Sequence, residues 1–420
     1  MQVVWLYEHA IDWDGLRRFH HNLGRGLLGR RIERSPLPFA RYRWVLDPGP
    51  PDIDIVKCSR PRAELSDWAD ERSQLAADPQ WGPGWHLATL PLTDGSTAVS
   101  LVASHYLLDG IGLAVALVDA ISGNTRDLGY LPPRSRTPLR AVIEDLRRTA
   151  RDAPGVARAL AAVPKQVRVR RPEGAPSPAP QPGVSAGGGD EPVVVPGITI
   201  YIDVDVFDTR AESLGGTANT LIAGLAAKLG EHMGHQHDED GAVTVQLVIS
   251  NRTEGDTRAV AVSLARIQVD PTEVTKDLRD TRAAVKLALK AWRETPHVSS
   301  HLESLTPFMP KWTWKWAVNQ SFADPDRPVV CSNLGDVGAV VNRLDGTDAE
   351  YSYARGTRQC VARGWLERIG GQMQLLSFRI PGRVVIHVLA YQPGAENTKP
   401  ALRELAAQAL ADFDLVGKVE

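Results

Sequence analysis

The feature that most constrains the fold of this chain is a proline- and glycine-rich segment near its middle. Residues 171–196 read RPEGAPSPAPQPGVSAGGGDEPVVVP, in which few side chains can contribute to a hydrophobic core. The segment divides the 420 residues into two parts of similar size. We therefore expect an N-terminal lobe over residues 1–170, a crossover linker over 171–196 and a C-terminal lobe over 197–420.

Composition excludes several classes of protein. The formal net charge is −2, whereas nucleic-acid binding requires a strongly basic face. Three cysteines give no disulfide framework, which fits a reducing compartment. The first residues lack the regions of a signal peptide, and no apolar run reaches the roughly 20 residues that span a bilayer. We expect a cytoplasmic protein whose membrane contact is at most peripheral.

Hydrophobic periodicity predicts strands and helices in both halves. In the first half, strands are expected over residues 2–7, 41–45, 85–91 and 98–104, and helices over 13–28, 61–74, 111–121 and 137–162. In the second half, strands are expected over 199–207, 243–250, 329–334, 372–380 and 383–391, and helices over 219–232, 272–293 and 400–413. Antiparallel hairpins occur beside helices, so the fold class is α/β, with the mixed sheets of an α+β protein.

One short segment has a pattern typical of catalysis. Residues 104–110 read SHYLLDG and stand between an apolar strand and an apolar helix. His105 would lie at the mouth of the strand, and Gly110 would allow a tight turn into the helix. Histidine suits proton removal near neutral pH, because its ordinary pKa is about 6.5. The pattern therefore predicts that His105 is the general base, and a histidine in a turn near a helix start is the alternative reading.

Asp109 lies four residues after this histidine and has two possible roles. It can contact His105, or it can hold the turn through an ion pair with an arginine. We favour the second role, in which loss of a buried partner costs about 3–5 kcal/mol. Arg252, just after the predicted strand 243–250, is the expected partner, and a solvent-exposed loop arginine is the alternative reading of that residue.

The chain resembles the chloramphenicol-acetyltransferase-like superfamily, whose active-site segment reads HHxxxDG. Residues 104–113, SHYLLDGIGL, are similar to that segment. Similarity extends to AID at 10–12, TANTLIAGL at 217–225 and VCSNLG at 330–335, in the order of the family. The superfamily includes coenzyme-A-dependent acyltransferases, wax ester synthase/diacylglycerol acyltransferases, polyketide-associated acyltransferases and nonribosomal peptide condensation domains.

The resemblance assigns roles to the matching residues. It implies that His105 is the base, that Asp109 is structural and that Gly110 is the glycine of the motif. The first histidine of the family is replaced here by Ser104. The DFGWG segment of condensation domains is not recognisable, and residues 335–338 occupy roughly its place. This departure favours O-acylation over peptide condensation.

The resemblance also implies an architecture and a reaction. Two lobes of similar fold would form a cleft that contains His105. An acyl group would move from a thioester, either acyl-CoA or the phosphopantetheine of an acyl-carrier protein, to an acceptor hydroxyl. No bound cofactor or metal is implied, and a carrier protein or polyketide synthase is the expected partner. Ser332 and Asn333 are candidate oxyanion donors or tunnel residues.

Two other functions stay open at this point. The chain could be a non-catalytic or carrier-docking module that has kept the histidine, because Ser104 replaces the first motif histidine. It could also be a condensation enzyme that forms amides. A further segment, PFMPKWTWKW at 307–316, could line an acyl tunnel or lie at a membrane interface, although tryptophans packed into the core explain it better.

Overall fold

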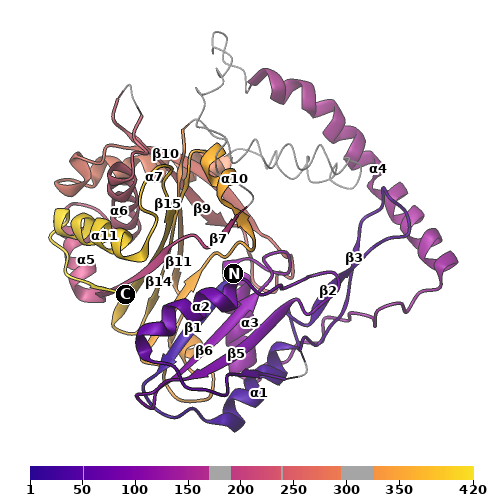
Figure 1. Cartoon of the computed structure of the whole chain (residues 1–420). Helices are drawn as coiled ribbons and strands as arrows, with labels where there is room; N and C mark the ends of the chain where they lie inside the picture. Colours follow the sequence, from indigo (N-terminus) through magenta and orange to yellow (C-terminus); the bar gives the residue numbers. More distant parts are fainter. Residues whose placement is uncertain (51, 170–190, 238–239, 295–325) are drawn as a thin grey trace.

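The computed structural model describes residues 1–50, 52–169, 191–237, 240–294 and 326–420. Two sheets, each with its own helices, form two neighbouring lobes, and the long helix α4 (Pro138–Val169) projects away from both (Figure 1). Both sheets contain parallel and antiparallel pairs. The predicted mixed α/β fold with two lobes is thus confirmed. Within the described residues, no helix is long and apolar enough to span a bilayer.

The first sheet carries the strand that leads to the motif. Its five strands lie in the order β12 (Tyr351–Arg355), β1 (Gln2–Tyr7), β6 (Thr97–Ala103), β5 (Trp85–Pro91) and β4 (Asp54–Ile55). Helices α1 (Trp13–Leu23) and α3 (Gly110–Ile121) pack in the core on one face, and α2 (Leu65–Ser73) covers the other. Strand β12 comes from the second half of the sequence, so the chain crosses back to complete this sheet.

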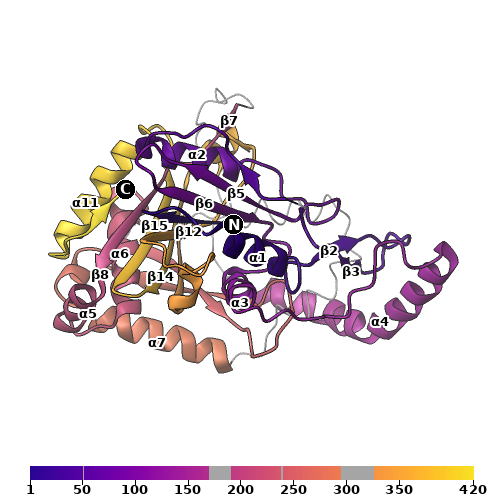
Figure 2. The same ribbon diagram turned by 90° about the horizontal axis from the view of Figure 1, so that it is seen from below.

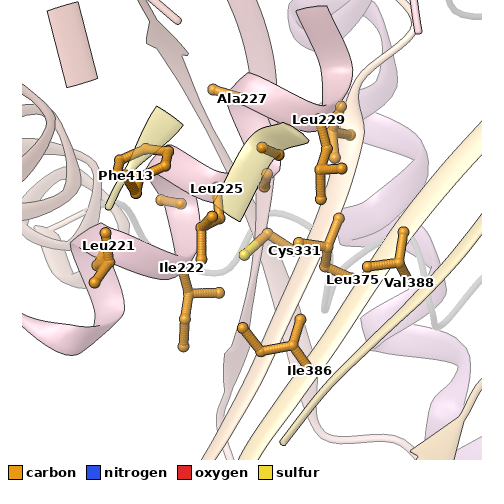
Figure 3. Packing of buried hydrophobic residues seen from close by; sticks show 14 of the residues in the cluster. Leu221, Ile222, Leu225, Ala227, Leu229, Cys331, Leu375, Ile386, Val388 and Phe413 are labelled. Atoms are coloured by element: carbon orange, nitrogen blue, oxygen red, sulfur yellow. The ribbon is translucent and has the colours of Figure 1, made fainter. Parts of the chain in front are cut away.

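The second sheet has seven strands. Their order is β10 (Val262–Val269), β9 (Val243–Ser250), β11 (Val329–Asp336), β14 (Gln372–Ile380), β15 (Arg383–Tyr391), β8 (Gly197–Asp203) and β16 (Lys418–Val419). One face is covered by α5 (Val204–Ser213), α6 (Ala218–His232), α7 (Arg279–Glu294) and α11 (Lys399–Asp412), which lie on the outer side of the sheet in Figure 2. Figure 3 shows Leu225 and Leu229 of α6 close to Leu375 and Val388 of the sheet.

The other face of the second sheet meets the first sheet. Tyr201, Phe378 and Val385 form a buried cluster against which Tyr351 and Tyr353 of β12 pack. Tyr353 also stacks on the His387 ring, with the ring centroids 5.5 Å apart. Strand β12 therefore belongs to one sheet by its hydrogen bonds and joins the two sheets by its side chains.

Smaller elements complete the part of the chain that the structure describes. They are the hairpin of β2 (Arg30–Glu33) and β3 (Arg43–Leu46), the pair of β7 (Pro192–Val193) and β13 (Val361–Ala362), the short helix α10 (Arg363–Arg368), and 3-10 turns at Arg62–Glu64, Glu273–Thr275 and Ala339–Asn342. Residues 171–190 of the expected linker and the aromatic segment 307–316 lie outside the described residues.

Most predicted elements are confirmed, some of them to the residue, but one strand was too long. The alternation over 199–207 predicted a strand, whereas β8 ends at Asp203. The Asp203 carboxylate accepts hydrogen bonds from Asp205 N at 2.9 Å and Val206 N at 3.2 Å, so it caps α5. Two predicted helices were also too long: α1 ends at Leu23, and α7 begins at Arg279 after a 3-10 turn.

Candidate active site

The motif segment forms a tight turn between β6 and α3. Ser104 N donates to Gly84 O at 2.9 Å, and Leu107 N donates to Ser104 O at 3.0 Å. A Cβ on Gly84 would lie 2.5 Å from Leu107 Cδ1, so the glycine leaves room for Leu107 in its observed position. The buried Ser104, Leu107 and Leu108 anchor the turn, while His105 between them is exposed.

His105 is accessible to solvent, yet protein surrounds much of its ring. Desolvation by these surroundings is the main cause that lowers the pKa of His105 below its ordinary value of 6.5. The charge of Asp109 raises this pKa, but by less than desolvation lowers it. The imidazole is therefore neutral at pH 7 and can accept a proton, as a general base must.

Asp109 is occupied by the backbone and by one arginine. It is the N-cap of α3, and its Oδ1 accepts a hydrogen bond from Gly112 N at 2.7 Å. Its Oδ2 accepts from Ala261 N at 2.7 Å and from Arg252 Nη2 at 2.8 Å. No described hydrogen bond joins this carboxylate to His105, so the geometry favours a structural role.

The ion pair expected between Asp109 and Arg252 is present. The two side chains are only 2% and 4% exposed. Arg252 Nη1 also donates to Asp256 O at 2.9 Å, and Nη2 donates to Arg258 O at 3.1 Å. These acceptors lie in the loop between β9 and β10 of the second sheet. The pair therefore fixes the motif turn of one lobe to a loop of the other.

Arg30, at the start of β2, makes a second connection that the sequence did not reveal. Its side chain is buried, and Nη2 donates to Leu107 O of the motif turn at 2.6 Å. Nη1 donates to Thr257 O at 2.6 Å and to Tyr130 Oη at 2.8 Å. Leu107 lies in the motif turn and Thr257 in the Arg252 loop. Two buried arginines thus hold the same turn against the same loop.

The structure separates the two candidate oxyanion donors. Asn333 of β11 donates a hydrogen bond to Asn219 of α6, and its Oδ1 accepts one from Gly335 N at 2.9 Å, so its amide faces α6. Ser332 lies between Asn333 and Cys331, which packs in the core with α6, so its side chain is on the other face of β11, where Leu334 packs against the cluster of Tyr201 and Phe378. Leu334 lies against Gly110, because a Cβ there would come within 2.9 Å of Leu334 Cδ2. Of the two candidate donors, Ser332 therefore lies on the face of β11 turned toward α3, and Asn333 lies on the opposite face.

An apolar pocket with about 50 Å³ of space, partly open to solvent, lies between the two sheets beside the start of α3. Its walls come from β1, α3, β12, β11 and β14, and they include Trp5, Gly110, Ala114, Leu117, Leu334 and Leu376. Gly110 is the last residue of the motif segment and also lines this pocket. Elsewhere in the described ranges, no group of three His, Cys, Asp or Glu side chains is placed to hold a metal ion.

Similarity to known proteins is found among solved structures. No family model matches the sequence, and no curated protein does. The condensation domain of the Monacolin K polyketide synthase superposes with a TM-score of 0.55 at 13% identity, covering 98% of this chain and 90% of that one. The first condensation domain of the calcium-dependent antibiotic synthetase, in complex with a substrate analogue, gives 0.55 at 15%, covering 99% and 91%.

An acyltransferase has the same fold. Wax ester synthase/diacylglycerol acyltransferase from Marinobacter aquaeolei gives a TM-score of 0.51 at 15% identity, covering 98% of this chain and 93% of that one. The chain thus has the condensation-domain fold over nearly its whole length. The resemblance of the motif segments predicted a fold of this kind, and the superpositions confirm the fold. The epimerization domain of tyrocidine synthetase B shares it too, with a TM-score of 0.51, so the fold alone does not fix the reaction.

Proposed function

We propose that the protein is an acyltransferase that moves an acyl group from a thioester to an acceptor hydroxyl, with His105 as general base. The observation that carries the proposal is the state of this histidine. Its ring is accessible and its pKa is lowered by desolvation, while the neighbouring Asp109 is fully engaged in holding the turn. An accessible imidazole on a turn that is held at Leu107 and Asp109 suits proton transfer.

The reaction needs one proton carrier. His105 takes the proton of the acceptor hydroxyl, whose oxygen attacks the thioester carbonyl carbon. The tetrahedral intermediate then collapses, the carbon–sulfur bond breaks, and the imidazolium returns the proton to the leaving thiolate. Ser332, on the face of β11 turned toward α3, is the better placed of the two candidate donors to the oxyanion. Asn333 is engaged with α6 and is not assigned this role.

The donor is proposed to be acyl-CoA or an acyl-carrier protein. Condensation domains of peptide and polyketide synthetases share the fold, which supports a carrier-bound thioester. The wax ester synthase/diacylglycerol acyltransferase supports ester formation. An amide-forming condensation enzyme is the second candidate, favoured by the shared fold of the condensation domain of the calcium-dependent antibiotic synthetase.

The test measures release of free thiol from acyl-CoA, and in parallel from acyl-carrier protein, with and without primary alcohols or amines. We expect thiol release that depends on an alcohol. His105→Ala should lower it by about 10²–10⁴-fold, the usual contribution of a general base. The control is His21→Ala, which removes an exposed histidine of α1. Wild-type rates in His105→Ala would exclude the proposed mechanism, and release that depends only on amines would favour the condensation enzyme.

A further inference from the structure

The outer surface of α4 carries a row of apolar side chains that the rest of the described structure leaves accessible. Leu139 is 72% exposed, Ile143 40% and Leu146 46%, and the exposed Ala150 and Ala153 continue the row. We call these five residues the α4 stripe. Single exposed apolar side chains are common on proteins, whereas a contiguous row of them is typical of an interaction surface.

The spacing of the stripe indicates what it can bind. Its positions follow one another by four and three residues in turn, which is the heptad spacing at which two helices pack side by side. A stripe made of these positions alone is narrow, as in the seam of a coiled coil, and a helix that packs into a globular core has a wider apolar face. The α4 stripe therefore fits the apolar row of one other helix.

Polar contacts on another side of α4 hold the stripe outward. The buried Asp145 accepts hydrogen bonds from Arg136 Nη1 at 2.7 Å and from Ser35 Oγ at 2.6 Å. Asp152 accepts one from Arg41 Nε at 2.7 Å. Both aspartates lie roughly a third of the helix circumference away from the stripe. A rotation that buried the stripe would break these contacts, and the helix itself extends away from both sheets (Figures 1 and 2).

One border of the stripe is basic. Arg140, Arg147 and Arg151 lie on the same side of it, and all three are exposed. Arg140 makes an ion pair within α4, but neither Arg147 nor Arg151 has an ion-pair partner among the described residues. The other border carries the half-buried and uncharged Val142 and Thr149. A partner helix would thus meet positive charge along one edge only.

We propose that the α4 stripe docks an acidic amphipathic helix of a partner protein. The apolar row of that helix packs on Leu139, Ile143 and Leu146, and its carboxylates face Arg147 and Arg151. Opposite charges beside an apolar seam select the partner and set its orientation. The surface is separate from the motif turn, and the inference does not depend on the proposed function.

Two other occupants match the stripe less well. In an antiparallel pair of α4 helices from two copies of the chain, the arginine rows would face each other. In a parallel pair they would face the uncharged Val142 and Thr149, so a second copy supplies no countercharge. A helix that lies in a membrane surface needs a broad apolar face. The α4 stripe covers only roughly 80° of the helix circumference and ends in two alanines.

The experiment measures binding of a labelled synthetic peptide to the full-length chain by fluorescence anisotropy. The peptide has three heptads with Leu at the a and d positions and Glu at the e and g positions, and a companion peptide has Lys in place of Glu. We expect the acidic peptide to bind at least about tenfold more tightly than its companion. Added salt should weaken its binding, because salt screens exposed charges.

Three variants separate the apolar and the charged parts of the surface. Ile143→Ser should weaken binding of the acidic peptide by about tenfold, because one large apolar side chain is no longer buried in the complex. Arg147→Glu should weaken the acidic peptide and strengthen its companion. Arg148→Glu is the matched control, since Arg148 is also exposed on α4 but lies roughly half a turn away from the stripe. Melting temperatures verify that each variant is folded.

Several results would overturn the inference. They are equal affinity for the two peptides, no binding of the acidic peptide, or binding that neither Ile143→Ser nor Arg147→Glu changes. Sedimentation of the chain, alone and with vesicles of phosphatidylcholine and phosphatidylserine, covers the other occupants. A wild-type dimer that Ile143→Ser dissociates would assign the stripe to a second copy. Vesicle binding that is lost in the same variant would assign it to a membrane, and either result would replace the partner helix.

Discussion

Removal of the Asp109 carboxylate should destabilise the contact between the two lobes more than any other single change in the motif. The carboxylate receives three donors, namely Gly112 N, Ala261 N and Arg252 Nη2, all within 2.8 Å. Asp109→Ala leaves the 4%-exposed Arg252 side chain without its ion-pair partner and two backbone donors without this acceptor. Breaking a buried pair in this way costs about 3–5 kcal/mol.

Arg252→Met should cost less than Asp109→Ala. In that variant the carboxylate keeps its two backbone donors, Gly112 N and Ala261 N, which still partly compensate its charge. The double variant should cost less than the sum of the two single variants, because neither of its sites retains an unpaired charge. The order of the three losses in stability therefore tests the hydrogen-bond geometry around Asp109 as well as the size of the ion-pair contribution.

Thermal and urea unfolding of the wild type and the three variants provide the measurement. A loss of 3–5 kcal/mol corresponds to a fall in Tm on the order of 10 °C for a lobe of about 200 residues. Lys276→Met, at an exposed lysine that pairs with the exposed Glu273, is the control and should change Tm by little, since exposed pairs contribute about 0–1 kcal/mol. An Arg252→Met protein with wild-type stability and activity would refute the proposed role of the pair.

Three further outcomes are expected. The kcat/KM for acyl transfer should fall with decreasing pH only below pH 6.5, because the pKa of His105 is lowered and its imidazole stays neutral down to lower pH. A fall in kcat/KM that already begins above pH 7 would contradict this. Arg30→Met should lower kcat by about tenfold or more, because the motif turn would be displaced. Arg30→Lys should recover part of this loss. An Arg30→Met protein with unchanged kcat would show that the hydrogen bonds from Arg30 to the turn and to the loop are dispensable. A thiol reagent should modify two of the three cysteines in the native protein, the exposed Cys58 and Cys360, because burial raises the pKa of Cys331 to about 12; fast modification of all three would contradict the buried position of Cys331.

Sequence patterns predicted those helices and strands that are determined by neighbouring residues in the chain. The hairpin of β14 and β15 was predicted to the residue, because alternation on both sides of Pro381-Gly382 fixes both its strands and its turn. Strand β8 was predicted too long for a reason that is also local. Alternation continues beyond Asp203, but the aspartate side chain caps a helix there, and this preference overrides the period of the apolar residues.

Elements defined by distant contacts were harder to predict. Strand β12 is only five residues long, YSYAR, and its pairing with β1 joins opposite ends of the chain. Arg252 was identifiable because it follows a clear strand and because Asp109 needed a partner. Arg30 gave no such signal, since its acceptors are mainly backbone carbonyls, which no residue type reveals.

If the proposed function holds, the two arginines account for serine at the first position of the motif. Ser104 is buried and its backbone N–H is bound to Gly84 O, so this end of the turn is fixed by the main chain. The rest of the turn is fixed by Arg30 at Leu107 O and by Arg252 at Asp109. A histidine side chain at position 104 is therefore not needed to hold His105 in place. Ser104→His should accordingly leave kcat within about threefold of the wild type, provided the larger ring fits the buried position. A large gain in kcat would instead mean that the family's first histidine supports catalysis in a way that the turn of this chain does not supply.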